Sequence, residues 1–123
     1  MSSSSPEFNK TMLQPGDQTT YPRAGDTVSM IYTGWLYDTS KPNNRGTQFD
    51  SSIGRGPFKA KIGVGHVIQG WDEGVPTMSV GEKAVLTIPG EMAYGDRGFP
   101  GLIPPGTALV FEVELAGVGR GRG

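Results

Sequence analysis

The sequence predicts an α+β fold: a twisted, mostly antiparallel sheet of about five strands with one short helix laid across its apolar face. Alternating apolar and polar residues recur in several short segments, as is typical of strands with one buried face. Only residues 69–75 look helical. The 20 glycines and 10 prolines fall between these segments and mark turns. A chain of 123 residues with one continuous pattern fits a single domain with one core.

The strands are expected in five segments. In residues 27–36, Ser29, Thr33 and Trp35 turn to one face and the apolar set to the other: Val28, Met30, Tyr32 and Leu36. Residues 58–62 repeat the pattern with both lysines outward, and residues 108–115 repeat it with both glutamates outward. Residues 82–88 form a further strand and residues 8–13 a weaker one.

The expected helix, residues 69–75, contains Gly70 and Gly74, which are poor helix formers. It must therefore be held by packing of Trp71 and Val75 against the sheet. The proline that follows ends the helix.

The remaining segments set the boundaries. The polar stretch 37–48 is interpreted as a surface loop. Residues 8–118 are expected to form the domain, with flexible tails at residues 1–7 and 119–123.

The amino-acid composition argues against several classes of function. A net charge of -1 provides no basic field for phosphates, so nucleic acid is not expected as the main partner, and the Gly-Arg tail is only a weak RNA-binding candidate. The absence of cysteine excludes disulfides and thiol chemistry. With His66 as the only histidine, neither a metal site nor a Ser-His-Asp triad is favoured. The chain has no apolar run of membrane-spanning length and no secretory pattern, which predicts a cytoplasmic protein without a membrane partner.

Seven aromatic rings are expected to face inward, a large number for so small a core: Tyr32, Phe49, Phe58, Trp71, Tyr94, Phe99 and Phe111. Residues 93–106 form an unusually apolar Gly/Pro-rich loop, which favours a binding wall. Trp71 and Tyr94 are better explained as pocket walls, because each ring carries a polar tip that needs a partner when buried. For Phe58 and Phe111, core packing is an equally good interpretation.

Asp50 has two interpretations that the sequence leaves open. On spacing alone an Asx turn or a cap is favoured. The alternative is a carboxylate at the pocket edge, paired with Arg55 and oriented by Tyr32. Three other carboxylates are expected on solvated surface instead of in an acid–base pair: Asp72, Glu73 and Glu82.

A series of ordered motifs carries a family resemblance: Tyr32-Thr33-Gly34, Phe49-Asp50-Ser51-Ser52, Val67-Ile68-Gln69-Gly70-Trp71-Asp72-Glu73-Gly74, Met78-Ser79-Val80-Gly81-Glu82, Ala93-Tyr94-Gly95, Ile103-Pro104-Pro105 and Leu109-Val110-Phe111-Glu112-Val113-Glu114-Leu115. Over roughly residues 16–118 the chain closely resembles the FKBP-type peptidyl-prolyl isomerases, which are small single-domain immunophilins. So many motifs in the same order make a chance similarity untenable.

The resemblance implies a five-stranded antiparallel sheet wrapped on a short helix, and a pocket for a prolyl ring with Trp71 as its floor. Its walls would be Tyr32, Phe49, Val67, Ile68 and Phe111, with Phe58 and Arg55 at the edge and Phe99, Leu102 and Ile103 at the rim. Asp50 and Tyr94 would contact the ligand through their side chains. The Ile68 N–H and the His66 carbonyl would contact it through the backbone. The catalytic group is thus expected to be Asp50, Tyr94, Trp71 and Phe49, acting by desolvation and hydrogen bonding without a cofactor.

The resemblance also implies partners: proline-containing peptides and proteins, the macrolides tacrolimus and rapamycin, and the drug-dependent partners calcineurin and TOR kinase, for a chain expected to be monomeric. The alternative is a non-catalytic immunophilin module that binds and regulates another protein.

The chain departs from the family pattern at four places. The turn across residues 38–48 is longer, and the loop from Asp50 to Phe58 is about one residue short, which loosens the alignment of Arg55. His66 stands where many relatives have Glu, and Phe99 where some have His. We expect a more apolar rim and a shifted substrate or drug preference.

Overall fold

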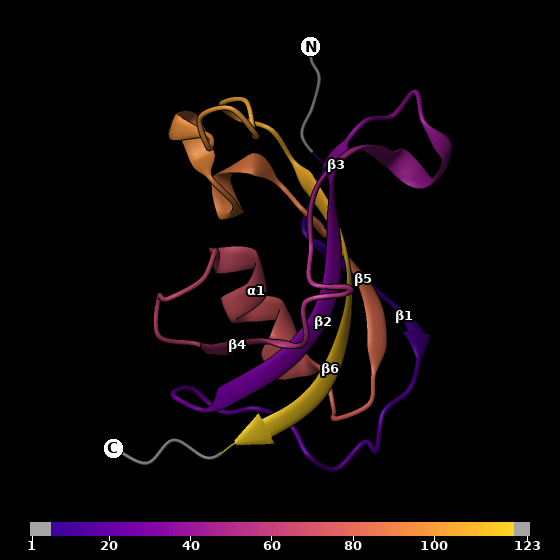
Figure 1. Cartoon of the computed structure of the whole chain (residues 1–123), viewed down its shortest axis with the longest axis vertical. Helices are drawn as coiled ribbons and strands as arrows, with labels where there is room; N and C mark the ends of the chain where they lie inside the picture. The colour runs from indigo at the N-terminus through magenta and orange to yellow at the C-terminus, as the bar shows by residue number, and fades with distance from the viewer. Residues whose placement is uncertain (1–5, 120–123) are drawn as a thin grey trace.

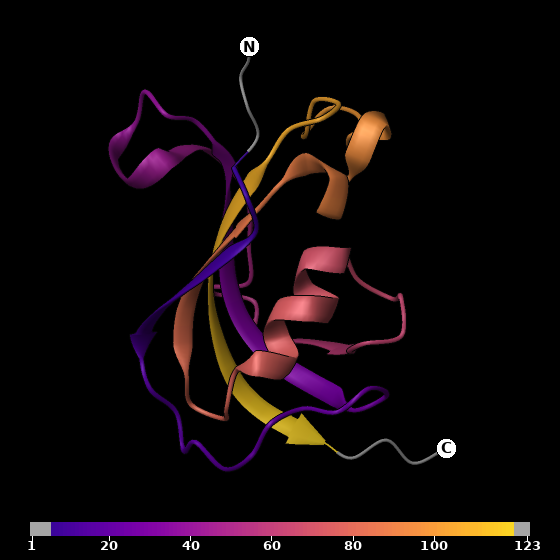
Figure 2. The ribbon, with the colours of Figure 1, turned by 180° about the vertical axis from the view of Figure 1, so that it is seen from behind.

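The computed structural model describes residues 6–119, and these residues form one antiparallel sheet around one helix (Figure 1). The strands are β1 (Asn9–Gln14), β2 (Thr27–Tyr37), β3 (Arg45–Ser51), β4 (Phe58–Lys61), β5 (Lys83–Ile88) and β6 (Leu109–Gly119). They lie in the order β1-β5-β6-β2-β3, and β4 pairs with the free part of β2. The helix α1 (Gln69–Gly74) packs against one face of the twisted sheet (Figure 2). The α+β prediction is therefore confirmed.

The long strands β2 and β6 form the centre of the sheet. Their register pairs Tyr32 with Val113 and Gly34 with Phe111. On β2 the side chains of Val28, Met30 and Tyr32 are buried, as the alternation predicts. Because this face meets α1, the core lies between the sheet and the helix.

The glycines of α1 are required by close packing. A Cβ on Gly70 would lie 2.6 Å from the side chain of Ile88, and one on Gly74 would lie 3.0 Å from the ring of Phe8. These contacts offset the poor helix propensity of glycine, because they let the helix approach the sheet. The helix ends at Gly74, and Val75 begins a short 3-10 turn.

The stretch 37–48 is not a loop throughout, so that interpretation was wrong. β2 runs on to Tyr37, a 3-10 turn occupies Pro42–Asn44, and β3 begins at Arg45, which gives one strand more than the five expected. Asn43 and Asn44 both have left-handed backbone angles, with φ of 56° and 59°. Such angles suit a tight hairpin turn between twisted strands, and asparagine tolerates them better than most residues.

Side-chain contacts with neighbouring strands, on the sheet face away from α1, hold the start of β3 in place. The Arg45 guanidinium lies 4.3 Å from the centroid of the Trp35 ring and pairs with Glu112 at 3.1 Å. The strand was missed because these residues are polar and their partners are distant in sequence.

Glu82 is buried, which corrects the expectation of a solvated position. Its side chain is 2% exposed, and Lys10 Nζ lies 2.7 Å from Oε2. The Ser79 N–H donates to Oε1 at 3.0 Å. This ion pair joins β1 to the turn before β5.

The first and last described residues can be compared with the expected domain boundaries. Gly119 is the last residue of β6, so the strand runs one residue into the expected tail. Residues 6 and 7 of the expected N-terminal tail are described and precede β1, whereas residues 1–5 and 120–123 lie outside the described residues. Between residues 6 and 119, no helix has the length and apolar character needed to cross a membrane.

Candidate active site

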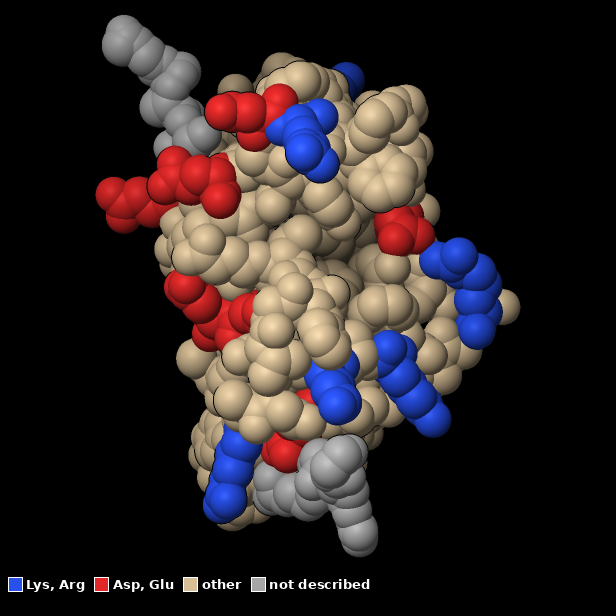
Figure 3. Space-filling model, turned by 90° about the vertical axis from the view of Figure 1, so that its left-hand side faces the viewer, with Lys and Arg blue, Asp and Glu red and all other residues tan. Residues whose placement is uncertain are grey.

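A cavity of about 260 Å³ opens between α1, the concave side of the sheet and the β5–β6 connection, residues 89–108. Figure 3 shows the hollow on this side of the molecule. Its lining consists of ten residues, each of which the sequence predicts as ligand-binding: Tyr32, Phe49, Asp50, Phe58, His66, Val67, Ile68, Trp71, Tyr94 and Phe111. The structure thus gathers ten of the fourteen predicted binding residues around one space.

The floor of the cavity is a cluster of rings in edge-to-face contact. The Trp71 ring lies 5.0 Å from Tyr32, 5.1 Å from Phe111 and 5.9 Å from Phe58, measured between centroids. Within the described part of the chain, the buried Trp71 Nε1 has no hydrogen-bond partner. Packing against the other rings therefore fixes the indole, and the expected polar partner for it is not found.

Gly34 permits two of these rings to meet. It lies on β2 opposite Phe111, and a Cβ at this position would lie 2.7 Å from ring atoms of both Phe111 and Phe49. Those two rings are 5.6 Å apart. Sequence reasoning singled out Gly34 only as part of a motif, because a glycine's effect on packing is visible only when the facing strand is known.

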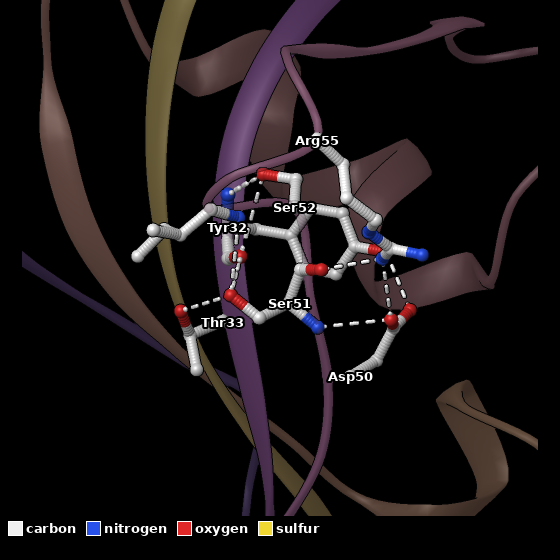
Figure 4. A network of polar contacts seen from close by, with 7 residues as sticks. Tyr32, Thr33, Asp50, Ser51, Ser52 and Arg55 are labelled. Carbon is white, nitrogen blue, oxygen red and sulfur yellow. Dashed lines mark hydrogen bonds and ion pairs between the residues drawn. The ribbon is translucent and has the colours of Figure 1, made fainter.

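Asp50 takes part in a polar network at the cavity edge (Figure 4). The Tyr32 hydroxyl donates to Asp50 Oδ2 at 2.5 Å, and Arg55 Nη2 donates to Oδ1 at 2.9 Å. Arg55 also donates to the Ser51 carbonyl. The Ser52 N–H, which an Asx turn would direct to Asp50, donates instead to the Tyr32 carbonyl at 2.9 Å. The geometry is that of the pocket-edge interpretation, and the Asx turn is not formed.

Hydroxyl groups hold the end of β3 against β2. The Tyr32 N–H donates to Ser52 Oγ at 2.9 Å, and Ser51 Oγ lies 3.0 Å from Thr33 Oγ1. Figure 4 shows both serines turned toward β2 while the Asp50 carboxylate points the other way, toward Arg55. These hydroxyls therefore position Asp50 through the backbone, a role that the sequence analysis did not assign.

The backbone at the start of α1 presents a free donor. The Ile68 carbonyl accepts from Trp71 and Asp72 N–H groups, whereas the Ile68 N–H has no protein acceptor among residues 6–119. Asp72 braces the preceding loop, since its carboxylate accepts the N–H groups of Gly63 at 2.7 Å and Gly65 at 2.9 Å. Asp72 is therefore not merely a solvated surface charge, as the sequence analysis expected.

A comparison with models of protein families shows which family has this sequence pattern. The model of the FKBP-type peptidyl-prolyl cis-trans isomerases matches residues 18–116. The chain belongs to this family. The prediction of a peptidyl-prolyl isomerase is therefore confirmed, as is the resemblance on which it was based.

Fungal FKBPs are among the similar curated proteins. FK506-binding protein 1B of Aspergillus fumigatus is 60% identical over 109 residues, which cover 88% of this chain and 91% of that protein. FK506-binding protein 1 of Yarrowia lipolytica is 59% identical over 107 residues, covering 86% and 93%. FK506-binding protein 1 of Saccharomyces cerevisiae is 59% identical over 104 residues, covering 84% and 85%.

In this FKBP chain both cavity phenols are held in their protonated form. Burial, followed by the hydrogen bond to Asp50 and its charge, raises the pKa of Tyr32 well above its usual value. Burial and the charge of Asp50 also raise the pKa of Tyr94. At neutral pH both hydroxyls are therefore hydrogen-bond donors.

The rim of the FKBP cavity is only partly where the resemblance puts it. The Phe99 ring contacts Tyr94 edge-on at 5.7 Å and, like Leu102, is about half exposed. Ile103 is 4% exposed and belongs to the core, because it exchanges two backbone hydrogen bonds with Phe99 that turn it inward. Leu102 and Ile103 line a separate hollow together with Arg97 and Pro100 of the same loop.

Arg55 lies beside the cavity and does not line it. It borders an adjoining hollow of about 390 Å³, together with Tyr32, Asp50 and Phe58. In the described residues, no cluster of three or more His, Asp or Glu side chains could hold a metal ion.

Proposed function

We propose that this FKBP isomerises X–Pro bonds in the cavity whose floor is Trp71. Rotation about the bond meets a barrier of about 18–20 kcal/mol because amide resonance is lost, and no covalent bond is made or broken. The site therefore needs neither a nucleophile nor a metal, and the aromatic and polar lining of the cavity supports the proposal.

The aromatic walls supply the first part of catalysis. A planar amide has more charge separation than a twisted one, so a water-poor aromatic cavity destabilises the planar ground state more than the transition state. The edge-to-face rings of Trp71, Tyr32 and Phe111, with Phe49 against Phe111, support this role. Transfer of the prolyl group into this cavity is thus the step that lowers the barrier.

Directed polar groups supply the second part. The free Ile68 N–H donates to a substrate carbonyl, the Tyr94 hydroxyl donates to a second one, and the His66 carbonyl remains an acceptor at the edge. Asp50, held by Tyr32 and Arg55, favours the twisted amide electrostatically. A rate gain of about 10⁴ corresponds to roughly 5–6 kcal/mol, which desolvation and one or two hydrogen bonds can provide.

Macrolide binding follows from the same cavity. The curated relatives are named for binding FK506, and at about 60% identity over most of the chain their ligand is a reasonable one for this protein. We infer that the chain binds FK506, which is tacrolimus, and rapamycin, and that the two complexes capture calcineurin and TOR kinase respectively. Phe99 and Leu102, both exposed, form the part of the rim that such partners would contact.

We also propose that the protein acts as a monomer in the cytoplasm. All ten cavity-lining residues come from one chain, and the sequence contains no cysteine that an oxidising compartment would pair.

The test is cis-to-trans relaxation of a Leu-Pro-Phe peptide with and without the protein, repeated with tacrolimus. Acceleration that the drug abolishes supports catalysis in this cavity. Drug binding without acceleration would favour the non-catalytic regulatory module. Acceleration that saturating drug leaves unchanged would contradict the assignment of the cavity.

A further inference from the structure

Two tyrosines line the cavity, and the structure holds their rings in different ways. The Tyr32 ring contacts three other rings, and its hydroxyl donates to Asp50. Among residues 6–119, the Tyr94 ring contacts only the ring of Phe99, and the Tyr94 hydroxyl bonds to no protein group. Phe99 is therefore the one aromatic support of the Tyr94 phenol in the part of the chain that the structure describes.

The backbone between the two residues brings their rings together. Tyr94 lies in the β5–β6 connection (orange in Figure 1), directly before the 3-10 turn Gly95–Arg97. Gly98 ends this turn, and its N–H donates to the Tyr94 carbonyl at 3.1 Å. The turn brings the Phe99 ring back against Tyr94, with 5.7 Å between the centroids and 86° between the ring planes. Aromatic pairs favour this edge-to-face geometry.

The backbone of Phe99 is tied to the core. Its N–H donates to the Ile103 carbonyl at 2.7 Å, and the Ile103 N–H donates back to the Phe99 carbonyl at 2.8 Å. The Ile103 side chain is buried in the core. Glycine is required at position 98, because its φ is 61° and a Cβ there would collide with the Ile103 carbonyl oxygen. The support of Tyr94 thus runs from the core through Ile103 to the Phe99 ring.

Phe99 adjoins the cavity without lining it. Its side chain is 47% exposed, and it is not among the ten lining residues, whereas Tyr94 is. The geometry therefore favours an effect of Phe99 on the site through the Tyr94 ring over a direct contact with a bound prolyl group.

We propose that Phe99 is a positioning residue, which holds the Tyr94 ring at the angle from which its hydroxyl donates to a substrate carbonyl. The inference rests on the proposed function, since that function gives the Tyr94 hydroxyl its role. No protein group among residues 6–119 accepts from this hydroxyl, so the placement of the ring sets its direction. Without the Phe99 ring, Tyr94 can turn toward solvent, and fewer bound substrates receive the hydrogen bond.

The experiment is a double-mutant cycle on the full chain, with kcat and KM measured for one Leu-Pro-Phe peptide. The cycle consists of Phe99→Ala, Tyr94→Phe and the two combined, and Phe99→Tyr is the conservative variant that keeps a ring. Arg97→Ala is the matched control, because it removes an exposed side chain from the turn between the two rings and leaves both rings in place. Urea unfolding checks that each variant is folded under the assay conditions.

We expect Phe99→Ala to lower kcat/KM about three- to tenfold when Tyr94 is present, and by less than about twofold in the Tyr94→Phe background. Phe99→Tyr and Arg97→Ala should stay within about twofold of the unsubstituted protein. Equal effects of Phe99→Ala in both backgrounds, including no effect in either, overturn the proposal, because Phe99 would then act independently of the Tyr94 hydroxyl. No acceleration by the unsubstituted protein would instead be a failure of the proposed function, and the positioning role would be overturned with it.

A second measurement does not depend on turnover. Burial and the charge of Asp50 raise the pKa of Tyr94, so its ionisation reports how the ring is placed. NMR of ring-labelled tyrosines follows this ionisation, and Tyr94→Phe assigns the signal. We expect the Tyr94 pKa to move toward its usual value in Phe99→Ala, because the released ring is better solvated, and to stay raised in Arg97→Ala. Unchanged ionisation of Tyr94 in Phe99→Ala overturns the proposal and leaves the proposed function standing.

Discussion

Replacing Gly34 by Ala tests whether the close approach of the cavity rings matters for both stability and catalysis. The added Cβ would lie 2.7 Å from ring atoms of Phe111 and Phe49, whereas an ordinary contact begins at 3.4 Å. Both rings, or β2 itself, must therefore move by about 0.7 Å, and overpacking of this kind costs about 1–3 kcal/mol of unfolding free energy. A displacement of about 1 Å at a catalytic site can reduce the rate up to about 100-fold.

The assay combines urea unfolding with peptide isomerisation at a temperature where the variant stays folded. We expect Gly34→Ala to lower the unfolding free energy by about 1–3 kcal/mol and kcat/KM by at least about tenfold. The matched control is Gly117→Ala on β6, where a Cβ meets nothing within 4 Å. The control should change neither quantity by much, since surface substitutions that disturb no packed contact usually stay within about 0.5 kcal/mol. Full activity and stability in Gly34→Ala would refute the claim that glycine is needed for the two rings to meet.

Three further outcomes are expected. Lys10→Met leaves Glu82 buried without its cation and should cost about 3–5 kcal/mol in urea unfolding. Lys10→Met/Glu82→Leu should recover only part of that loss, because the Ser79 N–H then has no acceptor, and equal losses in both variants would contradict the ion pair's role. Asp72→Asn keeps only one oxygen for the N–H groups of Gly63 and Gly65, so KM should rise several-fold with kcat little changed, and unchanged KM would contradict the bracing of this loop. Tyr32 and Tyr94 have raised pKa values, so their protonated forms stabilise the fold at neutral pH and this contribution is lost as pH rises through the folded-state values. Absorbance titration should therefore show Tyr32 and Tyr94 ionising above the usual pKa near 10, and ionisation of both near that value would contradict the burial of their hydroxyls in the cavity.

The sequence could predict the sheet, the helix and most of the cavity because these depend on local patterns. Alternation in β2 and β6 determines which side chains are buried, and family motifs identify the ten lining residues. The strand β3 could not be predicted from local patterns. Its first residue, Arg45, is held by contacts with Trp35 and Glu112 on other strands, which the sequence does not show.

Long-range partners explain the other differences. Glu82 resembles a surface charge until Lys10, far away in the chain, is brought beside it. The family resemblance places Ile103 at the rim, yet its backbone pairing with Phe99 turns it into the core. The choice between a turn and a pocket edge for Asp50 depended on where the Ser52 N–H points, which only the packing of β2 against β3 determines.

In the proposed mechanism, Asp50 assists the twisted amide and does more than hold the ligand. The most direct measurement is the turnover and the dissociation constant of one Leu-Pro-Phe peptide with Asp50→Val, both read from NMR exchange between cis and trans forms. We expect turnover to fall by about tenfold or more while the dissociation constant changes by less than about threefold. If turnover and affinity fall by equal factors, Asp50 only binds the substrate, and the proposed role in catalysis is contradicted.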